Sequence, residues 1–278
     1  MTDRERYREL IEKARKYYEG DVPELKNIFT GSELFDFEWC PGLDKEINMW
    51  TYWQGGKREN SNMSAEILLV GQDWGSCNDK DCFYKSYVGE VAPKTEAYVQ
   101  SIFSNKNNKT DSNLIELFKV LGEKYHADIP NPRLFFTNLC LGYRSIPQIS
   151  GGDVSAQMRH DSIYLKELIS ILKPRVVICI GASTYISAIT GLLDKDGLEQ
   201  YKDQLKQLGS SFNSALDDGK NHIHISSGGL DYEIFTVAHS GFMGANNRKR
   251  YSEKYKNLPD SLAVMKEDWK LIKKYLQN

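Results

Sequence analysis

Four near-continuous apolar runs constrain the fold of this chain more than any other feature of its sequence. They are rich in β-branched, leucine and aromatic residues and span residues 66–70, 133–138, 175–181 and 232–239. Such runs are typical of strands that are covered on both faces. Helical patterns lie between them, at residues 111–125, 155–172 and 182–208. The alternation predicts a three-layer α/β/α fold around a mostly parallel, four-stranded sheet.

The flanking segments add two helices and a strand candidate. Apolar residues recur at helical spacing over residues 4–19 and again over about 260–276. Residues 222–225 alternate between polar and apolar, which is compatible with a short additional strand beside the fourth run. We divide the chain into a helical, aromatic-rich N-terminal extension that packs on the core, residues 1–62, and an α/β domain, residues 63–278.

Composition and cysteine content narrow the class of protein. The 278 residues carry a formal net charge of -2, which counts against a strong nucleic-acid binder but leaves room for a local basic patch. Apolar stretches stay below the roughly 18 residues that cross a bilayer, so we expect a cytoplasmic protein without a membrane partner. Cys140 and Cys179 lie in strand-like runs and are predicted core residues, while Cys77 and Cys82 lack zinc spacing. We expect no metal and no cofactor.

Polar residues stand where each apolar run stops. Gln72 and Asp73 follow the first run, Asn138 ends the second, Ser183 follows the third, and His239 ends the fourth. In parallel α/β sheets the carboxyl ends of the strands lie along one edge, where ligands bind. The sequence therefore predicts that these side chains share one site.

The order of these residues resembles the uracil-DNA glycosylase superfamily. Gly71-Gln72-Asp73 is similar to its water-activating motif, and Asn138 to its base-reading asparagine. Ile180-Gly181-Ala182-Ser183 is similar to its DNA-holding turn, and Ala238-His239-Ser240 to its His-Pro-Ser loop without the proline. The resemblance covers roughly residues 65–250 and implies a uracil-DNA glycosylase-like fold for the α/β domain.

The resemblance also implies roles in catalysis and base recognition. Asp73 would stabilise the cationic sugar and orient a water, and His239 would donate a hydrogen bond to the departing base. Gln72 and Asn138 would contact the flipped base, whose edge a carboxamide can read, and Phe83 would stack on it.

A second set of residues would contact the DNA itself. Ser183 and Ser240 would hold phosphates, and Phe242 or Met243 would enter the space that the flipped base leaves. Local positive charge beside the fourth strand end would come from three consecutive residues: Arg248, Lys249 and Arg250.

The sequence departs from the main uracil-specific branch at one informative point. Trp74 and Gly75 follow Asp73, where that branch has proline and a tyrosine that excludes thymine. The resemblance therefore leaves the identity of the excised base open. The cysteines do not match the iron–sulfur branch of the superfamily.

Each candidate residue also has a structural interpretation. Asp73 could cap a following helix, Asn138 could satisfy a loop backbone, and His239 could be a hydrogen-bonded structural histidine. Phe83 could lie in the core, and Arg248 to Arg250 could form a solvated helix start.

The sequence thus predicts a monofunctional DNA glycosylase, a hydrolase of base-excision DNA repair. Its expected partner is DNA carrying a damaged or deaminated base, and no obligate protein partner is evident. One alternative is a non-catalytic nucleic-acid or nucleobase-binding protein on the same fold. Another is a hydrolase of small nucleosides or nucleotides.

Overall fold

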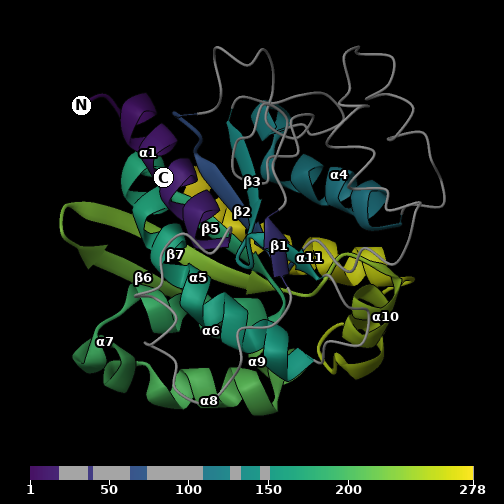
Figure 1. Ribbon diagram of the computed structural model, residues 1–278. Helices are drawn as coiled ribbons and strands as arrows, with labels where there is room; N and C mark the ends of the chain where they lie inside the picture. Colours follow the sequence, from purple (N-terminus) through teal and green to yellow (C-terminus); the bar gives the residue numbers. More distant parts are fainter. Residues whose placement is uncertain (19–36, 40–62, 74–108, 126–132, 145–150, 278) are drawn as a thin grey trace, which may run out of the picture.

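The computed structural model describes residues 1–18, 37–39, 63–73, 109–125, 133–144 and 151–277 (Figure 1). Its centre is a five-stranded sheet in the order β3-β2-β5-β7-β6. The strands are β2 (Ile67–Gly71), β3 (Leu134–Asn138), β5 (Val176–Ile180), β6 (His222–Ser227) and β7 (Leu230–Val237). β3, β2, β5 and β7 are parallel, and only β6 runs antiparallel, against β7.

The four predicted runs are the four parallel strands, but the expected number of strands was wrong. The alternating segment 222–225 belongs to β6, which adds a fifth strand at the edge beyond β7. Gly228 and Gly229 both adopt positive φ, at 60° and 79°, and supply the tight turn between β6 and β7. A separate two-stranded sheet, formed by β1 (Phe37–Trp39) and β4 (Gly142–Arg144), was not predicted. Three-residue strands are too short to show a period in the sequence.

Helices cover both faces of the five-stranded sheet, and each face has its own apolar cluster. Alternate residues of one strand point to opposite faces, so Leu68 and Val70 join the first cluster and Ile67 and Leu69 the second. The first cluster includes residues from α1 (Asp3–Tyr18), α5 (Gly151–Leu172), α6 (Ala182–Leu192), α8 (Lys202–Ser210) and α9 (Phe212–Asp217). The second includes residues from α4 (Lys109–Leu121), η4 (Glu123–Tyr125), α10 (Phe242–Tyr251) and α11 (Ser261–Gln277). The fold is therefore three-layer α/β/α, as predicted.

Helix α1 packs within the same core as the rest of the described chain. Its apolar side, including Tyr7, Leu10 and Ala14, is buried in the cluster that also contains Phe135 of β3. Lys13 of α1 pairs with Glu167 of α5 at 3.0 Å. Most of the remaining predicted extension, residues 19–36 and 40–62, lies outside the described residues, so the division at residue 62 stays a prediction.

The remaining short helix, α7 (Lys195–Gln200), begins where Asp194 accepts a hydrogen bond from the Gly197 N–H at 2.9 Å.

Among the helices that the structure describes, none combines the length and the apolar character needed to cross a membrane.

Candidate functional site

The carboxyl ends of β2 and β3 lie side by side and carry three of the predicted site residues. Gly71 is in register with Asn138 across the parallel pair, and Gln72 and Asp73 follow directly. The pairing continues past the strands, since Leu139 N donates to Gly71 O at 2.8 Å and Cys140 N donates to Gln72 O at 2.9 Å. These bonds hold Asn138 and Asp73 on adjacent segments of backbone.

The side chain of Asn138 lies against Gly71, where any larger residue would displace it. Its side chain is buried, at 4% exposure, and lies directly over Gly71. A Cβ at Gly71 would stand 2.1 Å from Asn138 Oδ1, far inside contact distance. The glycine of the Gly71-Gln72-Asp73 motif is therefore explained by the neighbouring strand.

Asp73 lies close enough to other groups of the site to shift their pKa values. Gln72 Nε2 donates to Asp73 Oδ2 at 2.9 Å, which fixes one carboxylate oxygen. Burial raises the pKa of the Cys140 thiol, and the carboxylates of Asp161 and Asp73 raise it further. Asp73 also acts on His239, which follows β7 on the far side of β5. The Asp73 carboxylate therefore influences one group after β3, Cys140, and one group after β7, His239.

His239 is held as a neutral ring with a defined tautomer. Gly241 N donates to His239 Nδ1 at 2.9 Å, so Nδ1 is an acceptor and the neutral ring carries its proton on Nε2. The side chain is exposed, yet desolvation by the surrounding protein lowers the pKa of His239 below the ordinary 6.5, against the opposing effect of the Asp73 carboxylate. The ring is thus prepared to donate a hydrogen bond from Nε2.

Helix α4 contributes a contact to this loop that sequence reasoning missed. Asn113 Nδ2 donates to Ser240 O at 2.7 Å, which holds the backbone directly after His239. The two residues are 127 positions apart in the chain, and no local pattern connects them.

Two helices begin at this edge without side-chain caps. Gly181, with φ 93°, precedes α6, and Gly241 precedes α10. Gly181 N donates to Val237 O at 2.7 Å, which ties the turn after β5 to the end of β7. Ser183 is exposed in the first turn of α6. Uncapped backbone N–H groups at a helix start favour anions such as phosphate.

The prediction that Arg248 binds DNA is wrong, and so is its interpretation as part of a solvated helix start. Arg248 lies in the last turn of α10 and is 1% exposed. Its guanidinium forms two 2.8 Å hydrogen bonds to Asp268 and one to Asp217, also at 2.8 Å. Because consecutive residues of an α-helix lie about 100° apart around its axis, the three cations of the run face different directions.

Of the other predicted DNA contacts, Ser240 is buried and Lys249 is bonded within the protein. Ser240 is 1% exposed, so its hydroxyl cannot reach a phosphate in this conformation. Lys249 Nζ donates to the backbone carbonyls of Lys256 and Leu258, the first at 2.7 Å. Phe242 and Met243 differ, because they stand 65% and 69% exposed in the first turn of α10, right after the His239 loop.

Several predicted residues lie outside the described part of the chain. These are Phe83, Trp74, Gly75, Cys77 and Cys82, so the stacking role of Phe83 stays a prediction. Cys140 and Cys179 are free and buried, as predicted for core residues. Over the described ranges, the side chains of His, Cys, Asp and Glu form no group of three suited to a metal ion.

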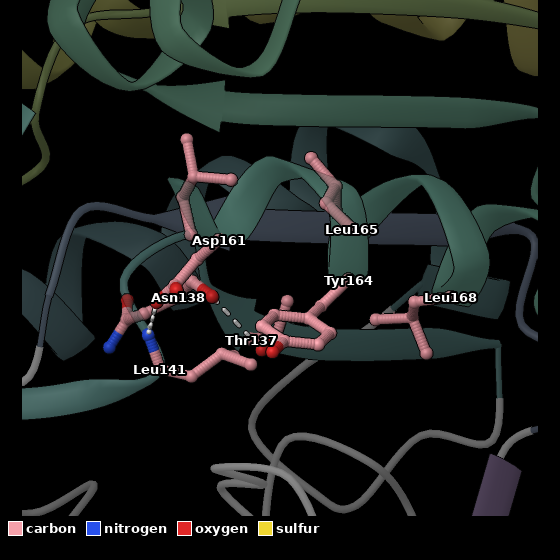
Figure 2. Close-up of a pocket in the computed structure, with 8 residues that line it drawn as sticks. Thr137, Asn138, Leu141, Asp161, Tyr164, Leu165 and Leu168 are labelled. Carbon is pink, nitrogen blue, oxygen red and sulfur yellow. Dashed lines mark hydrogen bonds between the residues drawn. The ribbon is translucent and has the colours of Figure 1, made fainter. Parts of the chain in front are cut away.

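A buried polar cluster below the end of β3 was also missed. We call it the Asp161 cluster; it consists of Tyr18, Gln157, His160 and Asp161. Asp161 and Asn138 both line a small cavity of about 10 Å³ between β3 and α5, enough for about one water molecule (Figure 2). The sequence did contain a signal, because Asp161 falls in the apolar series Met158, Leu165, Leu168 and Leu172 of α5.

Comparisons with known proteins give no family for this chain, so its proposed function is argued from the site. A scan against protein-family models and a search of curated protein sequences both found no match for this chain.

Proposed function

We propose that the chain is a DNA glycosylase that hydrolyses the N-glycosidic bond of uracil, or a related deaminated base, flipped out of DNA. The observation that carries this proposal is the meeting of Asp73, Asn138 and His239 at the carboxyl ends of the parallel strands. The Asp73 carboxylate acts on His239 electrostatically, and Asn138 is in register with the residue two before Asp73.

The charges of the three groups suit the cleavage of this bond. As the bond breaks, the sugar becomes cationic and the base becomes anionic. The Asp73 carboxylate, whose Oδ2 accepts a hydrogen bond from Gln72, stabilises the sugar and orients the attacking water. The neutral His239 ring donates from Nε2 to the base as negative charge develops there.

Base and DNA contacts follow from the same edge of the sheet. The Asn138 carboxamide offers both a donor and an acceptor to the base edge. Ser183 and the α6 N-terminus supply a phosphate contact. Exposed Phe242 and Met243 lie next to the His239 loop, where an apolar side chain can occupy the gap in the base stack.

The test is base release from oligonucleotides that carry one uracil, hypoxanthine, xanthine or mismatched thymine, single- and double-stranded. Wild-type protein should create alkali-labile abasic sites. Asp73→Asn should lower the rate by about 10²–10⁴-fold with unchanged folding, and His239→Ala by about 10²–10³-fold with unchanged DNA affinity. Asp203→Asn on the exposed surface of α8 is the matched control and should keep full activity.

The burial of Arg248 favours one part of the alternative, a protein that binds a free nucleobase without cleaving DNA. Arg248 was expected to contact the DNA backbone but faces the core instead. Its burial reduces the positively charged surface that could bind a nucleic acid. No base release from any oligonucleotide by folded wild-type protein, together with saturable nucleobase or DNA binding, would replace the glycosylase with this binder. Hydrolysis of free nucleosides would instead indicate a small-molecule hydrolase.

A further inference from the structure

The backbone that leaves Asn138 has four consecutive N–H groups, and the protein binds all of them. The first two, of Leu139 and Cys140, donate to Gly71 O and Gln72 O at the end of β2. The next two turn the other way, toward the buried Asp161 and the partly buried Tyr18. Leu141 N donates to Asp161 Oδ2 at 2.9 Å, and Gly142 N donates to the Tyr18 hydroxyl at 2.9 Å. This segment therefore joins the Asp161 cluster to the backbone of Gln72.

Asp161 is the centre of the Asp161 cluster and is 0% exposed. Its Oδ2 accepts from Leu141 N and from the Tyr18 hydroxyl. Its Oδ1 accepts from Gln157 Nε2 at 3.0 Å and lies 2.8 Å from His160 Nδ1. Both carboxylate oxygens are thus used twice, which is how a buried carboxylate remains compatible with the interior. Figure 2 shows Asp161 directed from α5 toward the Leu141 backbone.

Tyr18 brings the N-terminal helix into the Asp161 cluster. Its hydroxyl donates to Asp161 and accepts from Gly142 N and from Gln157 Nε2, the last at 3.2 Å. Burial and the Asp161 carboxylate both raise the pKa of Tyr18, so the hydroxyl keeps its proton. Tyr17, the preceding residue, stacks on the His160 ring with centroids 4.1 Å apart. The last turn of α1 is therefore fixed against both α5 and the segment after β3.

We propose that Tyr18 and Asp161 are positioning residues of the candidate site, and that they set the placement of Asn138 and Asp73 through the segment 139–142. This inference rests on the proposed glycosylase function. Neither residue is proposed to touch the substrate. They act by holding the backbone on which Asn138 ends and against which Gln72 and Asp73 are bonded. A misplacement of about 1 Å in such a site can cost about 100-fold in rate.

Tyr164 provides a matched control for Tyr18. It lies on α5, lines the same cavity as Asp161, and is buried. Its hydroxyl has no hydrogen-bond partner among the residues that the structure describes. Changing either tyrosine to phenylalanine removes one hydroxyl and keeps the ring, but only Tyr18→Phe removes a group bonded to the segment 139–142.

The experiment compares wild type, Tyr18→Phe and Tyr164→Phe by amide hydrogen exchange and by single-turnover and steady-state kinetics on uracil-containing DNA. Tyr18→Phe should exchange the Leu141 and Gly142 amides at least about tenfold faster and lower kcat about 10- to 100-fold, with KM changed less than about twofold. Tyr164→Phe should match the wild type in both measurements.

The outcomes separate this inference from the proposed function. If wild type is active and Tyr18→Phe keeps its kcat, the positioning role is overturned while the glycosylase stands. Equal effects of the two tyrosine substitutions would overturn it as well. If wild type releases no base, the glycosylase fails. In that case faster exchange in Tyr18→Phe alone would support the backbone restraint, and unchanged exchange would overturn it too.

Discussion

The carboxyl ends of β3 and β7 carry Asn138 and His239, and the protein holds these two ends by different means. After β3, polar side chains of α1 and α5 bind the backbone N–H groups of Leu141 and Gly142. After β7, the backbone is compact because glycines allow close approach. A Cβ at Gly244 would lie 2.4 Å from His239 O, and one at Gly241 would lie 2.9 Å from His239 Nδ1.

The difference predicts which changes each end tolerates. Hydrogen bonds to a buried carboxylate are lost when a donor or acceptor is removed, while close backbone contacts are lost when any side chain is added. The β3 end should therefore be sensitive to polar truncation, and the β7 end to a single added methyl group. The β7 end is also followed by an exposed helix start, that of α10.

The largest effect on stability is expected at Arg248, whose ion pairs hold α10, the helix after the β7 end. Arg248→Ala removes the partner of Asp268, which is 7% exposed, and of Asp217. Breaking one side of a buried ion pair costs about 3–5 kcal/mol, and urea unfolding should show a loss of that size. Arg250→Ala, two residues along on the exposed side, should change stability by less than about 1 kcal/mol. Similar losses in the two variants would contradict the anchoring role.

The next effect tests the close packing at the β7 end. Gly244→Ala places a methyl group against the backbone of His239, which cannot rotate away, so stability should fall by about 1–3 kcal/mol. Gly209→Ala in α8 is the control, because its new Cβ would meet only Ile186 Cδ1 at 3.6 Å. That variant should be as stable as wild type or gain about 0.5–1 kcal/mol, as alanine replaces glycine in a helix. Thermal unfolding of both variants measures the contrast.

A methyl group at the β3 end should affect position more than stability. In Gly71→Ala the new Cβ meets the side-chain oxygen of Asn138. The Asn138 side chain can rotate away from this contact. We expect a stability change within about 1 kcal/mol, since the off-rotamer cost and the gain from replacing glycine are of similar size. The Asn138 side-chain amide resonances should shift, and base release should drop if Asn138 reads the base. Unchanged resonances would contradict the placement of the Asn138 side chain against Gly71.

The smallest effect concerns the protonation of His239. Its folded-state pKa lies below the ordinary value, so the unfolded chain binds the proton more tightly than the folded one. The contribution of His239 to stability is therefore present above about pH 6.5 and is lost as the pH falls through the folded pKa. NMR titration of the ring should give a pKa below 6.5 and a neutral form protonated on Nε2. A pKa above 6.5 would contradict the effect of desolvation, and one well above 7 would leave the ring charged near neutral pH.

The structure places three of the candidate residues as predicted, at strand ends whose geometry local sequence sets. Asp73, Asn138 and His239 were predicted to converge because each stands at the end of an apolar run, and parallel strands end at one edge. Arg248 shows the limit of that reasoning. A run of three basic residues indicates surface charge, but α10 turns the first of them toward carboxylates 20 and 31 residues away.

By itself, the sequence determined the layer architecture, the parallel strands and the row of polar residues at their ends. These depend on hydrophobic periodicity and strand polarity, which are local properties of the chain. Only the tertiary structure decided that Gly71 makes room for Asn138, that Asn113 holds the His239 loop, and that Tyr18 and Asp161 bind the segment after β3. Those contacts join residues between 20 and 127 positions apart in the chain. Their partners are chosen by the packing of helices on the sheet, for which the sequence carries no local pattern.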